Sequence, residues 1–174
     1  HREGLPIPQA APVNPKSAKA RKAAKLVAGF FKAALPVIAQ KKPANGFLMR
    51  GIAHQPDIPL FQDRYGLRPG CIAVYPMYKG LAKLLGMTAY DVGGETEDLF
   101  AALEAHYAEH DFFYIHYKKT DAAGEDGNFE AKVRAIDEID TFIPRIEALK
   151  PDVLVVTADH STPSLMSGHS FHPN

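Results

Sequence analysis

From Gly66 onward, short apolar runs alternate with stretches of helical periodicity, and this alternation limits the possible folds more than any other feature. The apolar runs occupy residues 71–74, 88–92, 112–117 and 153–156. Between them the sequence predicts helices at about residues 77–85, 96–109 and 128–149. Strands and helices that alternate at these lengths indicate an α/β fold, with a mainly parallel sheet and helices on both faces.

The predicted helix at residues 128–149 has the clearest pattern. Apolar side chains recur at steps of three and four, at Phe129, Val133, Ile136, Ile139, Ile143 and Ile146. A stripe of this kind packs one helix face on the sheet. Because Pro144 lies inside the pattern, we expect it to bend or interrupt the last turns.

Residues before Gly66 have a different pattern. Four prolines in residues 1–15 indicate an extended lead-in, after which Ser17 is a candidate N-cap of a helix that Pro36 kinks or ends. We therefore place a domain boundary near Gly66, which gives domains 1–66 and 67–174. The chain has no initiator Met and stops just after a histidine cluster, so we expect it to be an internal fragment.

Composition limits the partners. Twenty basic and twenty acidic residues balance, so no global field would hold nucleic acid or an anionic membrane. No apolar stretch approaches the roughly 20 residues of a membrane span, and no leader opens the chain, which together indicate a soluble, cytoplasmic protein. The one cysteine, Cys71, cannot form an internal disulfide and is expected to be a small buried hydrophobe.

Metal-binding side chains come after two of the predicted strands. Residues 118–127 form an expected loop with two glycines and carboxylates that include Asp121 and Glu125. Asp159 and His160 come after the last apolar run, and His169 lies nine residues further on. Ligands in parallel sheets bind beyond the carboxyl ends of the strands, and these donors suit Mn²⁺, Zn²⁺, Co²⁺ or Mg²⁺. The same residues also occur in helix caps and solvated turns, so both interpretations stay open here.

Long strings of this sequence resemble a known family. TDAAGEDGNFEAKVRAIDEID at residues 120–140, and TADHSTP followed by GHSFHP, resemble the two metal-binding segments of archaeal-type cofactor-independent phosphoglycerate mutases. The resemblance extends to NGFLMRG and YKGLAKLLGM upstream. It implies the alkaline-phosphatase superfamily, so that residues 67–174 would be part of a metal-binding, alkaline-phosphatase-like domain and residues 1–66 part of an inserted cap domain.

The resemblance also implies a ligand set for two divalent ions, with manganese as the first expectation. Asp121, Glu125 and His169 would bind one ion, and Asp159 and His160 the other. Many relatives have histidine where this chain has Glu125, and His172 falls on a non-ligand position. The family's serine nucleophile and a further aspartate would precede this chain, so no catalytic residue is expected in it and the isolated chain should be inactive.

The function implied is an isomerase of glycolysis and gluconeogenesis that interconverts 2- and 3-phosphoglycerate through a phosphoserine. Arg50 and Lys79 are candidate substrate-binding residues, because a guanidinium and an ammonium at a helix start suit an anion. Arg50 is equally compatible with a solvated loop. Two alternatives remain, another phosphomutase or phosphohydrolase of the superfamily and a non-catalytic metal-binding module.

Overall fold

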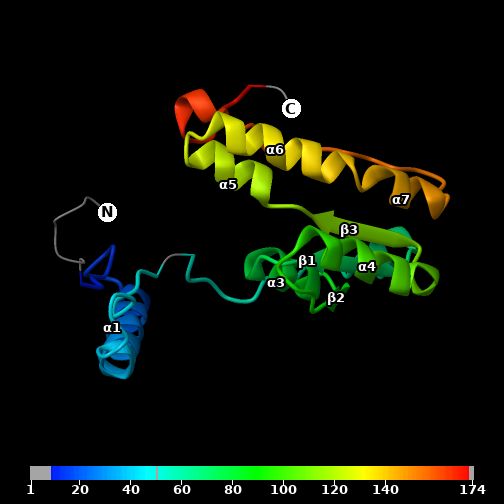
Figure 1. Ribbon diagram of the computed structural model, residues 1–174. Helices are drawn as coiled ribbons and strands as arrows, with labels where there is room; N and C mark the ends of the chain where they lie inside the picture. Colours follow the sequence, from blue (N-terminus) through cyan, green and yellow to red (C-terminus); the bar gives the residue numbers. More distant parts are fainter. Residues whose placement is uncertain (1–8, 50, 173–174) are drawn as a thin grey trace. The chain divides into compact units, whose positions relative to one another are not determined.

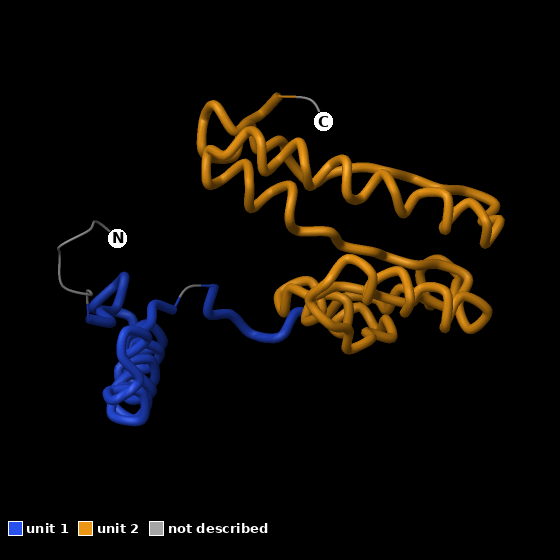
Figure 2. Tube along the Cα trace, viewed as in Figure 1, with its two compact units in different colours: residues 1–56 blue, residues 57–174 orange. Residues whose placement is uncertain are grey.

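The computed structural model describes residues 9–49 and 51–172, and the chain divides into two compact units, residues 1–56 and 57–174 (Figure 2). The helix α2 (Phe61–Tyr65) belongs to the second unit, where Phe61 stacks on Phe112 with ring centroids 4.7 Å apart. The division therefore comes before Gly66, which ends α2 in a left-handed conformation. The assignment of the first unit to a cap domain stays a prediction.

The first unit contains the helix α1 (Ala18–Ile38), and Ser17 caps it as expected. The Ser17 hydroxyl accepts a hydrogen bond from the backbone N–H of Ala20 at 3.3 Å. Pro36 lies inside the helix, which continues to Ile38. Phe31 stacks on Phe47 with ring centroids 4.6 Å apart. None of the residues of α1 is buried, so this aromatic contact remains partly exposed.

The second unit contains a parallel sheet in the order β2-β1-β3, built from β1 (Pro69–Ala73), β2 (Thr88–Tyr90) and β3 (Phe112–His116) (Figure 1). In the central strand, Cys71, Ile72 and Ala73 are fully buried. The predicted parallel sheet and α/β class are confirmed. The buried state of Cys71 also agrees with the sequence.

Helices cover both faces of this sheet, as predicted. Cys71 and Ala73 pack on one face with Ala82 of α3 (Pro76–Leu84). Ile72 points to the opposite face, where α4 (Thr96–His106) supplies Leu99, Phe100 and Leu103. Side chains of α6 (Phe129–Asp140) and α7 (Ile143–Ala148) pack on the same cluster. A short 3-10 turn, η1 (Tyr107–Glu109), leads from α4 toward β3.

The helix expected at 128–149 is interrupted near Pro144, as predicted. It is divided into α6 and α7, and Pro144 lies in the first turn of α7, where its missing N–H is not needed. The expected loop at 118–127 contains the helix α5 (Lys119–Glu125), so that prediction is wrong. The helix α5 contains a glycine, and its packing against α6 and against residues 164–166 stabilises it.

The predicted strand at 153–156 is also absent. Val153, Val155 and Val156 are each more than 70% exposed. A strand needs a neighbour to satisfy its backbone groups, and among residues 9–49 and 51–172 the sheet has three strands, with none beside this segment. The chain then forms a bridge between Ser161 and Ser170 and the 3-10 turn η2 (Ser164–Met166), which lies against α5 and α6.

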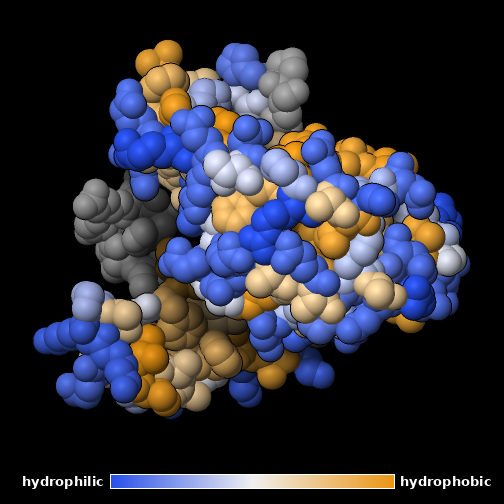
Figure 3. Space-filling view, turned by 45° about the vertical axis from the view of Figure 1, so that its right-hand side comes forward, coloured by the Kyte–Doolittle hydropathy of each residue, from blue (hydrophilic) through white to orange (hydrophobic). Residues whose placement is uncertain are grey.

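Other apolar side chains reach the surface as well. In Figure 3, hydrophobic atoms appear at several separate places among hydrophilic ones. The search for membrane spans over the described residues finds no helix with the length and apolarity to cross a bilayer.

An ion pair joins the starts of β1 and β3. The Arg68 guanidinium donates to both carboxylate oxygens of Asp111, at 2.9 and 2.8 Å. Two more hydrogen bonds join the same residues, because the Arg68 backbone N–H donates to the Asp111 carboxylate and the Asp111 backbone N–H donates to the Arg68 carbonyl. These hydrogen bonds lower the pKa of Asp111 to about 2.

We expect Asp111→Asn to destabilise the chain at neutral pH and to lose this effect in acid. The pKa of Asp111 is depressed on folding, so its stabilising contribution is present above the ordinary value of about 4 and disappears as the pH falls toward about 2. Urea unfolding of both proteins across this range measures the difference, with Asp152→Asn as a control in a loop. A difference that persists unchanged at the acid end would contradict this account.

Candidate metal centre

The candidate ligands come from two segments that meet beyond the carboxyl end of β3. Asp121 and Glu125 lie on α5, which starts three residues after β3 ends. Asp159, His160 and His169 lie on the C-terminal segment, whose turn η2 packs on α5 (Figure 1). The structure therefore brings together all five residues that the resemblance implied.

Their distances form two groups. His169 Nε2 lies 3.1 Å from Glu125 Oε1 and 3.8 Å from Asp121 Oδ1. His160 Nε2 lies 3.6 Å from Asp159 Oδ2, while its Nδ1 is 4.0 Å from Asp121 Oδ1. The two imidazole rings are in contact, with centroids 3.8 Å apart. Asp121 Oδ1 thus lies within 4.0 Å of a nitrogen of each histidine, and the division into two metal sites that the resemblance implied stays a prediction.

Lys118 neutralises the carboxylate of Asp121. Its ammonium forms an ion pair with Asp121 and lies 3.9 Å from Glu125 Oε2. Partial burial raises the pKa of Asp121, but hydrogen bonds from Lys118 and Thr162 more than offset this, so the pKa lies below its ordinary value. The same hydrogen bond raises the pKa of Lys118. Asp121 is thus ionised and able to bind a cation at neutral pH.

Tyr78 holds the other carboxylate. Its hydroxyl donates to Asp159 Oδ2 at 3.3 Å, from 81 residues away in the sequence. The ring of Tyr78 stacks on His116 at the end of β3, with centroids 3.7 Å apart. Burial raises the pKa of Tyr78, and the nearby charge of Asp159 adds to the effect, so the hydroxyl stays protonated as a donor.

Thr162 lies between the two groups of ligands and is 4% exposed. Its hydroxyl is 2.5 Å from Asp121 Oδ1 and 3.1 Å from His160 Nδ1. Its carbonyl accepts a hydrogen bond from Lys132 at 2.6 Å and lies directly over Gly124. Sequence patterns did not identify Thr162, Tyr78 or Lys132, because contacts across 30 to 81 residues leave no local signal.

The remaining predicted residues lie apart from the two ligand groups or cannot be placed. Lys79 donates to Asp91 Oδ1 at 2.9 Å, so its ammonium pairs with the segment after β2. Arg50 is outside the described residues. His172 Nδ1 is 2.8 Å from the Ser170 hydroxyl, and His172 is not a member of the ligand groups.

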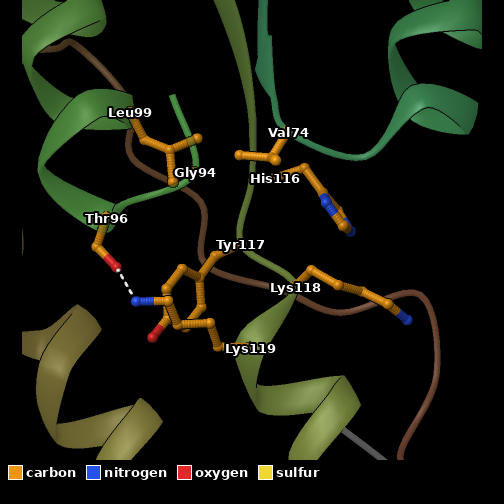
Figure 4. Close-up of a pocket in the computed structure, with 8 residues that line it drawn as sticks. All are labelled: Val74, Gly94, Thr96, Leu99, His116, Tyr117, Lys118 and Lys119. Carbon is orange, nitrogen blue, oxygen red and sulfur yellow. Dashed lines mark hydrogen bonds between the residues drawn. The ribbon is translucent and has the colours of Figure 1, made fainter. Parts of the chain in front are cut away.

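A hollow of about 110 Å³ lies at the same edge of the sheet (Figure 4). It is lined by Val74, Gly94, Thr96, Leu99, His116, Tyr117, Lys118 and Lys119. Figure 4 shows Lys119 reaching to Thr96, whereas Lys118 extends to the other side. Lys119 also pairs with Glu138 at 2.8 Å. Of the two neighbouring lysines, Lys118 therefore contacts the candidate ligands, and Lys119 joins α5 to α4 and α6.

The residues present fit a divalent cation. One ligand atom each from Asp121, His160 and His169 can be chosen so that all lie within 4.8 Å of one another, and this cluster includes residues of both ligand groups. Ligand atoms around one ion lie at most about 4.4 Å apart at bond lengths of about 2.0–2.2 Å, so small side-chain movements suffice. Carboxylate oxygens and imidazole nitrogens suit Mn²⁺, Zn²⁺ or Co²⁺, whereas thiolate ligation is excluded because Cys71 is buried in the sheet.

We expect Gly124→Ala to disturb this centre and Gly80→Ala to be harmless, although both glycines lie inside helices. A Cβ at residue 124 collides with the Thr162 carbonyl, whereas a Cβ at residue 80 meets nothing within 4 Å. Gly124→Ala should cost about 1–3 kcal/mol of unfolding free energy by overpacking. Gly80→Ala should be neutral or stabilise by about 0.5–1 kcal/mol. Equal effects in urea unfolding would contradict the close contact.

Comparison with known proteins places these residues in a family. The model of the metalloenzyme superfamily matches residues 43–173. A protein of Aquifex aeolicus is 47% identical over 165 residues, and one of Thermosipho africanus is 46% identical over 172 residues. Both carry the name probable 2,3-bisphosphoglycerate-independent phosphoglycerate mutase. The matches cover 93% and 99% of this chain but 40% and 42% of the relatives, so the chain spans about 40% of their length.

Solved structures agree with the observed architecture. A Pyrococcus horikoshii protein matches with a TM-score of 0.69 and 26% identity over 90% of this chain and 47% of its own. The cofactor-independent phosphoglycerate mutase of Thermoplasma acidophilum matches with a TM-score of 0.50 and 23% identity, over 86% of this chain and 41% of its own, which supports the fold alone. The family match, the parallel sheet and the ligand groups at its carboxyl edge lead to one conclusion: the chain belongs to the metalloenzyme superfamily.

Proposed function

We propose that this chain is the metal-binding part of a phosphoglycerate mutase that interconverts 2- and 3-phosphoglycerate without 2,3-bisphosphoglycerate. The observation that carries the proposal is the convergence of Asp121, Glu125 and His169 with the pair Asp159 and His160. Relatives that carry the name of this enzyme match nearly the whole chain, which supports the choice of substrate. Such an isomerase of glycolysis would work in the cytoplasm.

The proposed ligand sets are Asp121, Glu125 and His169 for one ion, and Asp159 and His160 for a second. Two divalent ions, when bound, supply Lewis-acid stabilisation of a phosphoryl group and activation of a hydroxyl nucleophile. Manganese is the first candidate for both ions. Two protein ligands are fewer than a stable site usually has, so the second site needs at least one more group. The distances of 3.1 to 3.8 Å within each set support this division.

Cationic side chains would hold the anionic substrate. Lys118 has its ammonium between Asp121 and Glu125 and lines the hollow, so it is available to a phosphate or carboxylate at this edge. Lys79 pairs with Asp91, whose side chain is 88% exposed, and a substrate anion can replace such a weak surface partner. Arg50 remains a proposed substrate-binding residue.

Activity is best assayed on the gene product that carries this chain, beside the chain alone. We expect the gene product to convert 3-phosphoglycerate to 2-phosphoglycerate in the presence of manganese, and we expect a chelator to abolish this activity. Phosphopentoses and nitrophenyl phosphate serve as competing substrates. Preference for either of them would replace the proposal with another phosphomutase or phosphohydrolase, and metal binding without turnover of any substrate would indicate a non-catalytic module.

Variants of His169 and His172 test which of the two histidines near the end of the chain binds metal. His169→Ala removes an imidazole 3.1 Å from Glu125, and we expect it to weaken Mn²⁺ binding by at least about 100-fold, since even outer partners of ligands contribute about 10–100-fold. His172→Asn should bind Mn²⁺ like the unaltered chain, because His172 pairs with Ser170. Titration of Mn²⁺ followed by the electron paramagnetic resonance of the free ion checks both. The opposite ranking would move the ligand assignment to His172.

A further inference from the structure

Thr162 is one of the two buried polar residues among the described parts of the chain, together with Thr96. Neighbouring residues contact both its carbonyl and its hydroxyl. The carbonyl is held by Lys132, and Gly124 leaves space beneath it. The hydroxyl faces Asp121 and His160, so it contacts a candidate ligand from each of the two groups.

Only one placement of the Thr162 and His160 protons satisfies both hydrogen bonds of the Thr162 hydroxyl. A threonine hydroxyl has one proton, and an ionised carboxylate can only accept. The distance of 2.5 Å between Thr162 Oγ1 and Asp121 Oδ1 is typical of a hydroxyl that donates to a charged carboxylate. With its proton committed to Asp121, the hydroxyl can only accept at 3.1 Å from His160 Nδ1. His160 must then carry its proton on Nδ1.

We propose that Thr162 is a positioning residue, which fixes His160 as the Nδ1–H tautomer and directs the bare Nε2 toward Asp159. Nε2 is the ring nitrogen that lies 3.6 Å from Asp159 Oδ2. His160 Nδ1 and Asp121 Oδ1 lie 4.0 Å apart, and the Thr162 hydroxyl hydrogen-bonds to both. In this proposal the two atoms therefore do not bind the same ion. One hydroxyl thus orients a ligand of each proposed ion and assigns His160 to the second.

The consequence for metal binding rests on the proposed function, whereas the tautomer does not. Histidine ligands depend on a partner at the second ring nitrogen, and loss of such a partner weakens metal binding by about 10–100-fold. Removal of the Thr162 hydroxyl should have an effect of this size. It should also free the Asp121 carboxylate from one of its hydrogen-bond donors.

The first test is the tautomer of His160 in the metal-free, 174-residue chain. Long-range nitrogen-15 correlation spectra at about pH 8, where an ordinary imidazole is neutral, distinguish the two tautomers. The spectrum of His160→Gln assigns the signal. We expect a protonated Nδ1 and a bare Nε2. A protonated Nε2 would overturn the proposal, whatever the chain does with metal and whether or not any variant folds.

The second test compares Mn²⁺ affinity in three variants. Thr162→Val removes the hydroxyl at nearly constant volume and should weaken binding by about 10–100-fold. Thr162→Ser keeps the hydroxyl and should restore binding, which a merely structural role of the methyl group would not predict. Thr157→Val is the matched control, since its exposed hydroxyl has a long contact of 3.4 Å with a neighbouring carbonyl. Circular dichroism verifies folding.

The outcomes separate the two proposals. A folded Thr162→Val that keeps both the tautomer and the Mn²⁺ affinity of the unaltered chain contradicts the positioning role. If the unaltered chain binds no Mn²⁺ but His160 has the predicted tautomer, the proposed function fails while the assignment of Thr162 holds. If Thr162→Val does not fold, the tautomer of the unaltered chain and the affinity of Thr162→Ser decide.

Discussion

The parallel pairing of β1 with both of its neighbours is the constraint on which the second unit depends. Strand β1 hydrogen-bonds to β2 on one side and β3 on the other, and its residues Cys71, Ile72 and Ala73 have no exposed surface. Parallel strands end at the same edge of a sheet. The helices α3 and α4 therefore cross over from β1 to β2 and from β2 to β3, and the helix that comes after the end of β3 is α5, which carries Asp121.

A second constraint brings the C-terminal segment to this edge. It has no strand to hold it among the described residues, and contacts with α5 and α6 take that role. The close approach at Gly124, the hydrogen bond from Lys132 and the hydroxyl of Thr162 all act on one short piece of chain. The candidate metal centre is consequently a product of tertiary packing between two segments, and its geometry depends on a few contacts around Thr162.

Much of the sheet unit was predictable from the sequence, because its strands and helices have simple periodic patterns. Strand β3 and helix α4 bury apolar faces with the expected spacing, and local rules suffice for them. The run at 153–156 has the same apolar character but no neighbour to pair with, so propensity alone did not make it a strand. Conversely, the glycines and carboxylates of 118–127 resemble a loop, yet packing makes α5 a helix. The convergence of the five candidate ligands was predictable from their places after apolar runs and from the resemblance. Thr162 and Tyr78 were not, because their roles arise from contacts between distant segments.

The central proposal is a divalent-metal centre formed by the five side chains at the carboxyl edge of the sheet. Anomalous diffraction from crystals of this chain grown with Mn²⁺, recorded on both sides of the manganese absorption edge, tests it most directly. The predicted result is a manganese peak bounded by Asp121, Glu125 and His169, with any second peak beside Asp159 and His160 Nε2. A fully occupied manganese peak elsewhere on the chain, with these five side chains bound to no ion, would contradict the proposal.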